Sequence, residues 1–184
     1  MIILLIELFA LILLADFITG GIHWWEDTYG NPDWKYMGKL IVIPNIEHHQ
    51  YPRKFLGSSM WERVKLSVFF VILLLIIFII MDAVSWQLIV LFTYGSLANE
   101  CHAVSHRTDK ENGFIVRMIQ KTGLIQSRKM HGLHHTAPYS TNYCIQTNYL
   151  NPILNTIRFW AILETIIAWF GIKPTRGQEN RNGY

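Results

Sequence analysis

Three histidines within the sequence SRKMHGLHH (127–135) are the residues of this chain best suited to metal chemistry. His131, His134 and His135 have the i, i+3, i+4 spacing that places side chains on one face of a helix. Three imidazoles on one face are costly to desolvate unless something uses their nitrogens. Neutral imidazole suits Zn, Cu, Fe and Ni, so the motif predicts a transition-metal site.

The other five histidines occur in three short groups, each close to an apolar segment. Adjacent histidines on a helix cannot both point the same way, so one of such a pair could bind a metal while the other orients it. Taken alone, each group could consist of ordinary surface or core histidines rather than metal ligands. The groups are His23 with Asp27, the pair His48 and His49, and His102 with His106.

The composition indicates a membrane protein. Hydrophobic residues make up 51% of the 184 residues and charged residues 16%, which is low against about 25% for soluble domains. The net charge of +3 is modest and its basic residues lie between apolar runs, so they indicate topology rather than nucleic-acid binding. The length predicts one domain, 1–184, with a polar tail at 172–184. Two cysteines indicate no disulfide framework and favour a reduced, cytosol-like environment.

Four apolar segments predict an all-α, multi-pass membrane protein with three to four transmembrane helices. Residues 1–22 form a first span that ends near His23, because about 20 apolar residues suffice to cross a bilayer. Residues 64–81 and 86–104 are separated by a short DAVS linker and form an antiparallel hairpin. Residues 152–171 carry polar interruptions, so we expect a half-inserted or re-entrant helix rather than a fourth full span.

Two segments are expected to lie outside the bilayer. Residues 23–63 read as polar and irregular, with tryptophans suited to a membrane–water interface. Residues 114–121 predict a short amphipathic helix in the interface, which Gly123 would end.

The order of the spans predicts that all eight histidines reach one side of the membrane. The first helix crosses the membrane to that side, and the two helices of the hairpin cross away from that side and back to it. The segments 31–65 and 105–130 on that side are rich in Lys and Arg, so the positive-inside rule makes it cytoplasmic. Convergence of four groups favours metal binding over separate surface histidines. Eight imidazoles exceed the four ligands of a tetrahedral zinc, so we expect two metal ions.

The first span also carries polar residues on one helical face. Asp16, Gly20, His23 and Asp27 are spaced four, three and four residues apart. Asp16 either supports the metal site from behind or lies at the helix end. Gly20 would let another helix approach closely.

The motifs resemble those of one protein family. H-x-x-x-H followed by H-x-x-H-H is similar to the membrane desaturase and hydroxylase superfamily. In detail, ADFITGGIHWWEDTYG, EHH, ECHAVSH and SRKMHGLHHTAPYSTNYCI resemble the lipid desaturase family. That family contains the animal and bacterial plasmanylethanolamine desaturases and the plant plastid phosphatidylglycerol desaturase. The resemblance covers nearly the whole chain.

This resemblance implies an O2-dependent, membrane-bound di-iron desaturase that acts on a membrane phospholipid. No catalytic residue separate from the metal site and no nucleotide-binding motif is expected. Electrons would come from an external donor, cytochrome b5-like or ferredoxin-like. The implied metal residues are His23, Asp27, His48, His49, His102, His106, His131, His134 and His135.

The substrate is left open between the vinyl ether of an ether phospholipid and an acyl chain. Members of the family that form vinyl ethers tend to have a further histidine directly before His131, where this chain has Met130. The alternatives are a di-iron lipid hydroxylase and a non-catalytic metal- or haem-binding membrane protein. Arg128 and Lys129 could contact a lipid phosphate or serve as topology anchors.

Overall fold

The computed structural model describes residues 1–137 and 139–175, and this part of the chain consists of helices and loops without a β-strand. The predicted all-α fold is confirmed. A π-helical turn at Gly38–Val42 precedes α2, and a 3₁₀ turn at Lys54–Gly57 follows it. The α-helices are α1 (Ile2–Tyr29), α2 (Ile43–Gln50), α3 (Met60–Ile80), α4 (Trp86–Ser96), α5 (Ala98–His106), α6 (Asp109–Thr122), α7 (Arg128–His134), α8 (Leu150–Thr156) and α9 (Phe159–Trp169).

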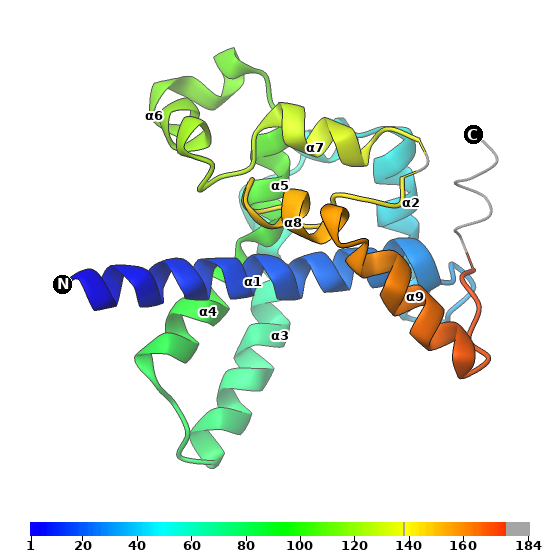
Figure 1. Ribbon diagram of the computed structural model, residues 1–184, viewed down its shortest axis with the longest axis horizontal. Helices are drawn as coiled ribbons and strands as arrows, with labels where there is room; N and C mark the ends of the chain where they lie inside the picture. The colour runs from blue at the N-terminus through cyan, green and yellow to red at the C-terminus, as the bar shows by residue number, and fades with distance from the viewer. Residues whose placement is uncertain (138, 176–184) are drawn as a thin grey trace.

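The long helix α1 lies between two groups of helices (Figure 1). On one side, α3 and α4 form the predicted hairpin, which extends crosswise from α1 and contacts it through α4. On the other side lie α2, α5 and α7, and α5 packs against α7. The helices that carry histidines after α1 are therefore on the side of α1 away from the hairpin tip.

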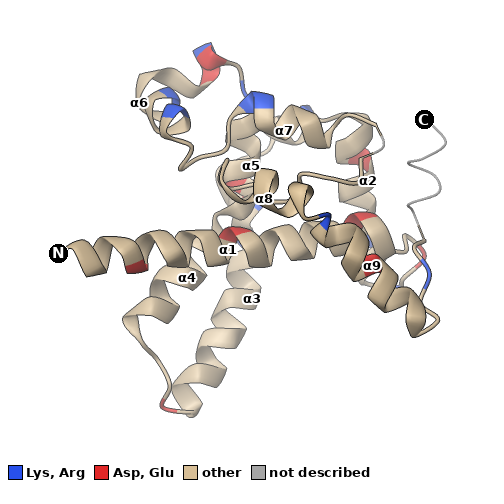
Figure 2. Ribbon diagram, viewed as in Figure 1, with Lys and Arg blue, Asp and Glu red and all other residues tan. Residues whose placement is uncertain are grey.

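Among the described residues, α1 and α3 are the two helices long and apolar enough to cross a membrane. Their most apolar windows have mean hydropathies of 2.6 and 2.8, and only 11% and 6% of these windows are buried in the protein. Exposed apolar surface of this extent is what contact with lipid requires. The outer part of the hairpin lacks Lys and Arg, which gather on α6 and α7 (Figure 2). Helices α1 and α3 run crosswise to each other (Figure 1).

The first helix does not end near His23 as predicted but continues to Tyr29. The polar side chain of Asp27 faces the protein interior, so polar residues in this stretch do not mark a loop. The helix ends at Gly30, shortly before Pro32, because proline disfavours a helical conformation in the residue before it. The following polar segment is also more regular than predicted, since it contains α2.

The prediction of one continuous helix over 86–104 is wrong, because the segment is broken at Leu97 into α4 and α5. The Ser96 hydroxyl donates to the carbonyl of Thr93 at 2.8 Å, a local bond that competes with the helical pattern. With 11 residues, α4 is about 16 Å long, well short of a bilayer core of about 30 Å. The break gives α5 its own direction, toward α7.

The segment 152–171 is interrupted, as expected, by a break that separates α8 from α9. Arg158 adopts a left-handed conformation with φ of 54° at this break. The predicted polar tail at 172–184 lies outside the described residues after Thr175.

Helix α6 is divided by Gly113, which is non-helical with a φ of 70°, so its second part, 114–122, confirms the amphipathic helix predicted for 114–121. Thr108 and Glu111 form a capping box, which starts the helix at Asp109. Gly123 ends the helix as predicted, with a φ of 82° that glycine adopts without strain.

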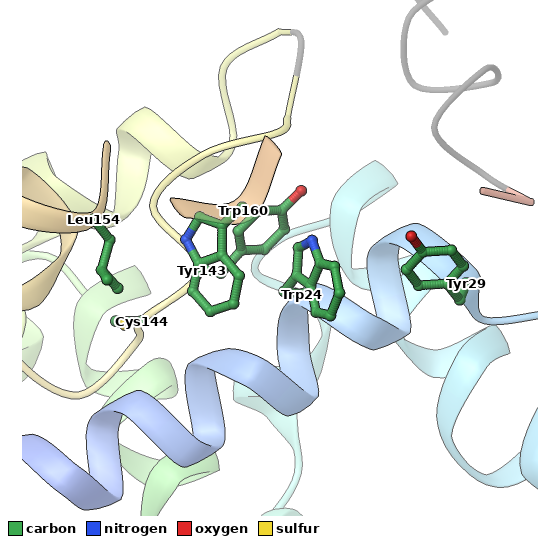
Figure 3. Close-up of a cluster of buried hydrophobic side chains, with 6 residues drawn as sticks. All are labelled: Trp24, Tyr29, Tyr143, Cys144, Leu154 and Trp160. Atoms are coloured by element: carbon green, nitrogen blue, oxygen red, sulfur yellow. The ribbon is translucent and has the colours of Figure 1, made fainter. Parts of the chain in front are cut away.

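An aromatic core lies between the second half of α1 and the α8–α9 segment (Figure 3). This core holds the loop that follows α7 against α1, directly beside His23. Its buried members are Trp24, Tyr29, Tyr143, Cys144, Leu154 and Trp160.

Candidate metal centre

Five histidines from three elements direct their Nε2 atoms toward one point. Helix α5 supplies two of them, α7 and the residue after it supply two, and α2 supplies one. Six pairs of these Nε2 atoms are between 2.8 and 3.2 Å apart. This five-histidine group consists of His48, His102, His106, His131 and His135.

Hydrogen bonds among the rings cannot account for this arrangement. The Nε2 of a neutral imidazole carries either a proton or a lone pair, never both. Five such atoms can therefore form at most two one-to-one hydrogen bonds, and the remaining close contacts would bring like atoms together. A metal ion resolves this conflict, because several lone pairs can point at it at once.

The spacing of the five nitrogens also fits a metal ion. Imidazole nitrogens bind first-row metals at about 2.0–2.1 Å, so two ligands at right angles are about 3.0 Å apart. The observed separations of 2.8 to 3.2 Å bracket this value.

A second group combines one carboxylate with three histidines. The Oδ1 of Asp27 is 3.0 Å from Nε2 of His49. Its Oδ2 is 3.3 Å from Nε2 of His134 and 3.7 Å from Nε2 of His23. One ligand atom from each of the four residues lies within 4.8 Å of the others, so they could hold one ion together.

Two backbone carbonyls fix the orientation of rings in this second group. Nδ1 of His23 is 3.1 Å from the carbonyl oxygen of Tyr143, and Nδ1 of His134 is 2.9 Å from that of Thr141. A carbonyl only accepts, so each Nδ1 carries the proton and each Nε2 keeps its lone pair. These are the tautomers that present Nε2 to a metal.

The two groups are neighbours and share sequence motifs. The ring centroids of His49 and His135 are 5.0 Å apart, and those of His134 and His135 are 5.5 Å apart. The adjacent pair on α2 is split, with His48 in the five-histidine group and His49 in the second group. The motif on α7 is split as well, because His134 faces the second group while His131 faces the first.

All nine residues expected from the sequence are thus brought together. One contact was not predicted: Asn45 donates from Nδ2 to Oδ1 of Asp27 at 2.6 Å. Asn45 precedes His48 and His49 by three and four residues, so helical spacing could have identified it. Arg128 and Lys129 are exposed at the start of α7, and a headgroup contact there stays a prediction.

Burial keeps the histidines of the five-histidine group neutral. The pKa of His48 is lowered to about 2, first because burial disfavours the charged ring and then because His106 is nearby. Burial likewise holds the pKa of His131 well below its usual value. Neutral rings are the form that binds metal.

Asp16 supports the second group from behind. Its carboxylate accepts hydrogen bonds from the backbone N–H of Gln146 at 2.8 Å and of Thr147 at 3.0 Å, and from the Thr147 hydroxyl at 2.6 Å. It thereby holds the buried segment that carries the carbonyl of Tyr143, the partner of His23. Of the two roles considered for Asp16, the structure supports the one behind the site.

The sequence predicted that Gly20 would let another helix approach closely. The structure instead places the loop segment that contains Cys144 against Gly20. A Cβ at Gly20 would lie 2.7 Å from Sγ and 3.0 Å from Cα of Cys144. The segment can therefore lie against α1 only because residue 20 has no side chain.

An apolar cavity of about 590 Å³ leads to both groups. Side chains of α1, α3 and α4 form most of its wall, including Ile18, Leu66 and Phe92. Three histidines line it at the metal end, namely His23, His48 and His102.

Comparison with known proteins identifies the family. Residues 12–177 match the family described as the lipid desaturase domain. The chain is 31% identical over 179 residues to a probable fatty acid desaturase of Acanthamoeba polyphaga mimivirus, covering 88% of this chain and 82% of that protein. It is 32% identical over 175 residues to plasmanylethanolamine desaturase 1 of Mus musculus, covering 88% and 64%.

A third relative is fatty acid desaturase 4, a chloroplast protein of Arabidopsis thaliana, with 29% identity over 173 residues covering 91% of this chain and 53% of that protein. The chain thus spans less than two thirds of the mouse and plant proteins. No solved structure matches it. Since the family match extends over nearly the whole chain and includes every residue of both ligand groups, the chain belongs to the lipid desaturase domain family.

Proposed function

We propose that this protein is a membrane-bound di-iron desaturase that uses O2 to introduce a double bond into a membrane lipid. The observation that carries the proposal is the position of two adjacent groups of metal-ligand atoms at the end of an apolar cavity. Membership of the lipid desaturase family supports the reaction class.

Each ligand group would hold one iron ion. The first offers five imidazole nitrogens, and the second offers three with the carboxylate of Asp27. Bound iron would supply the activation of O2. The protein's part is to keep the five histidines of the first group neutral, to fix the tautomers of His23 and His134, and to hold the second group in place from behind through Asp16.

The apolar cavity would hold the hydrocarbon chain of the substrate. Its walls are formed by the same helices that expose apolar surface, so a chain could enter from lipid without crossing water. Excluding water favours reaction with C–H bonds over side reactions. Relatives are named as fatty acid desaturases and as plasmanylethanolamine desaturases, so the substrate is an acyl chain or the alkyl chain of an ether phospholipid.

The reaction removes two hydrogens from adjacent carbons and reduces O2 to two waters. Two further electrons and two protons are required, and an external one-electron donor, cytochrome b5-like or ferredoxin-like, would deliver the electrons. We infer that the metal centre faces the cytoplasm, which is supported by the gathering of Lys and Arg on α6 and α7 (Figure 2).

Metal analysis tests the cofactor. Purified protein should contain two irons per chain, one for each ligand group. One zinc per chain, or no metal after reconstitution with ferrous iron, would contradict the proposal.

Lipid mass spectrometry tests the reaction and separates the substrates. Expression in a host without such an activity should produce lipids lighter by two hydrogens, either in ether or in acyl chains. His134→Ala should abolish the product, whereas Lys54→Ala, on the exposed surface near α2, should not. Product with an added oxygen would instead identify a hydroxylase.

A further inference from the structure

Four oxidisable rings, which Figure 3 shows, form a series of ring contacts that starts beside His134 and ends near the end of α1. The Tyr143 ring centroid lies 5.3 Å from that of His134. From Tyr143 the next centroid, of Trp160, is 5.3 Å away, and that of Trp24 is 5.5 Å further. The Tyr29 ring is another 5.5 Å from Trp24. We call these four residues the ring chain.

The polar atoms of the ring chain are not explained by packing. Among the described residues, Nε1 of Trp160 and the hydroxyl of Tyr29 are buried without a hydrogen-bond partner. A buried polar atom without a partner destabilises the fold, so phenylalanine would serve a purely apolar core better. The same cluster does use phenylalanine at its edge, at Phe17 and Phe159. What Tyr and Trp offer and Phe does not is ready loss of one electron.

A carboxylate is placed where it would stabilise such an oxidised ring. Glu164 lies in the apolar helix α9, and its Oε1 accepts a hydrogen bond from Nε1 of Trp24 at 3.2 Å. A negative charge beside the indole favours its oxidation, because the oxidised ring is positive. The same carboxylate can take the indole proton.

We propose that the ring chain conducts oxidising equivalents away from the metal centre when no lipid occupies the cavity. This inference rests on the proposed oxidative function, which supplies the oxidant. Tyr143 would lose one electron to the oxidant that bound iron supplies, and its phenol proton would pass to water. Trp160 would return an electron to Tyr143, which takes a proton back from water, and Trp24 would in turn reduce Trp160 and pass its N–H proton to Glu164. An external one-electron reductant such as ascorbate would finally restore Trp24, directly or through Tyr29, and Glu164 would return the proton to Trp24.

The chemistry decides the direction of transfer. Tyr and Trp give up an electron only to a strong oxidant, so the ring chain cannot relay electrons from a weak biological donor to resting ferric ions. It can act only after O2 has been activated. Its use is protection, because an oxidant left without a C–H bond would otherwise attack the histidines.

The test uses iron-loaded protein in detergent without substrate lipid, reduced with dithionite and then mixed with O2. Electron paramagnetic resonance after rapid freezing should detect a Tyr or Trp radical. Peptide mass spectrometry should find oxidation at Trp24 and Tyr29. In Trp160→Phe, oxidation should move to Tyr143 and the metal-binding histidines, and iron loss per O2 consumed should rise several-fold. The matched control is Trp34→Phe, because Trp34 stacks on Trp25 and is not part of the ring chain.

A second variant guards against misfolding of Trp160→Phe. Glu164→Gln keeps an acceptor for the Trp24 indole but removes the charge and the proton acceptor, and should weaken the Trp radical signal at unchanged iron content. If both variants show the wild-type radical and oxidation pattern while lipid desaturation persists, the ring-chain inference is overturned and the proposed function stands. If the protein neither holds iron nor consumes O2, both are overturned.

Discussion

Replacing Asp16 with alanine should loosen the second ligand group although Asp16 is not one of its members. Three donors point at the Asp16 carboxylate: the N–H groups of Gln146 and Thr147 and the Thr147 hydroxyl. Without these hydrogen bonds, the carbonyl of Tyr143 is no longer fixed, and His23 loses the partner that orients its ring. Iron per chain should therefore fall from two toward one, with the five-histidine group retained.

The expected loss of stability follows from the donors left unpaired. Each buried donor without an acceptor costs about 1–3 kcal/mol, so Asp16→Ala should lose about 4 kcal/mol once the Thr147 hydroxyl has turned to another partner. Asp16→Asn keeps one oxygen, which can serve both donors of Thr147 and leave only Gln146 facing an NH2 group. That variant should lose about 2 kcal/mol.

Thermal unfolding of metal-free protein in detergent measures the stability, and iron analysis measures the ligand group. Glu7→Ala removes an exposed acid from the same helix and is the matched control. Thr147→Val combined with Asp16→Asn should be clearly non-additive, because both changes affect one hydrogen-bond network. Retention of two irons and an unchanged unfolding temperature in Asp16→Ala would refute the reasoning.

Three further predictions concern the packing, the charge state and the cavity. Gly20→Ala places a Cβ 2.7 Å from Sγ of Cys144; it should destabilise the protein by about 1–3 kcal/mol in thermal unfolding, and wild-type stability would contradict the close contact. The pKa of His48 is about 2 in the folded chain and about 6.5 unfolded, so metal-free protein should lose stability as pH falls below 6.5, by about 2 kcal/mol at pH 5 for each such histidine. An unfolding temperature that does not fall between pH 7 and pH 5 would rule this out. Leu66→Trp should fill the cavity and abolish lipid product at full iron content, whereas Leu73→Trp on the exposed face of α3 should not; equal activity of the two variants would argue against the cavity as the substrate site.

The convergence of the histidines was predictable because it depends on residue chemistry and on chain order. The expectation that adjacent histidines must point apart was also met, since His48 and His49 face different groups. The placement of three histidines of the α7 motif on one face was predicted too simply. His134 turns toward Asp27, because the carbonyl of Thr141 fixes its ring.

What could not be predicted depends on contacts between distant parts of the chain. Asp16 meets Thr147 across 131 positions of sequence, and no local pattern announces that pair. The break at Leu97 falls within an apolar run that contains neither proline nor a charged residue to mark it. The continuation of α1 past His23 depends on which polar side chains are buried, and burial is a property of the folded molecule.

The division of α2 and α7 between the two ligand groups links the loading of the two ions. Consecutive Cα atoms are 3.8 Å apart, so His48 cannot become ordered without ordering His49. An ion that binds the five-histidine group thus immobilises backbone that the second group also needs, and the next ion meets a smaller entropic cost. Under the proposed function, loading of the unmodified protein should therefore be cooperative, and the empty and fully loaded forms should dominate over a chain with a single ion.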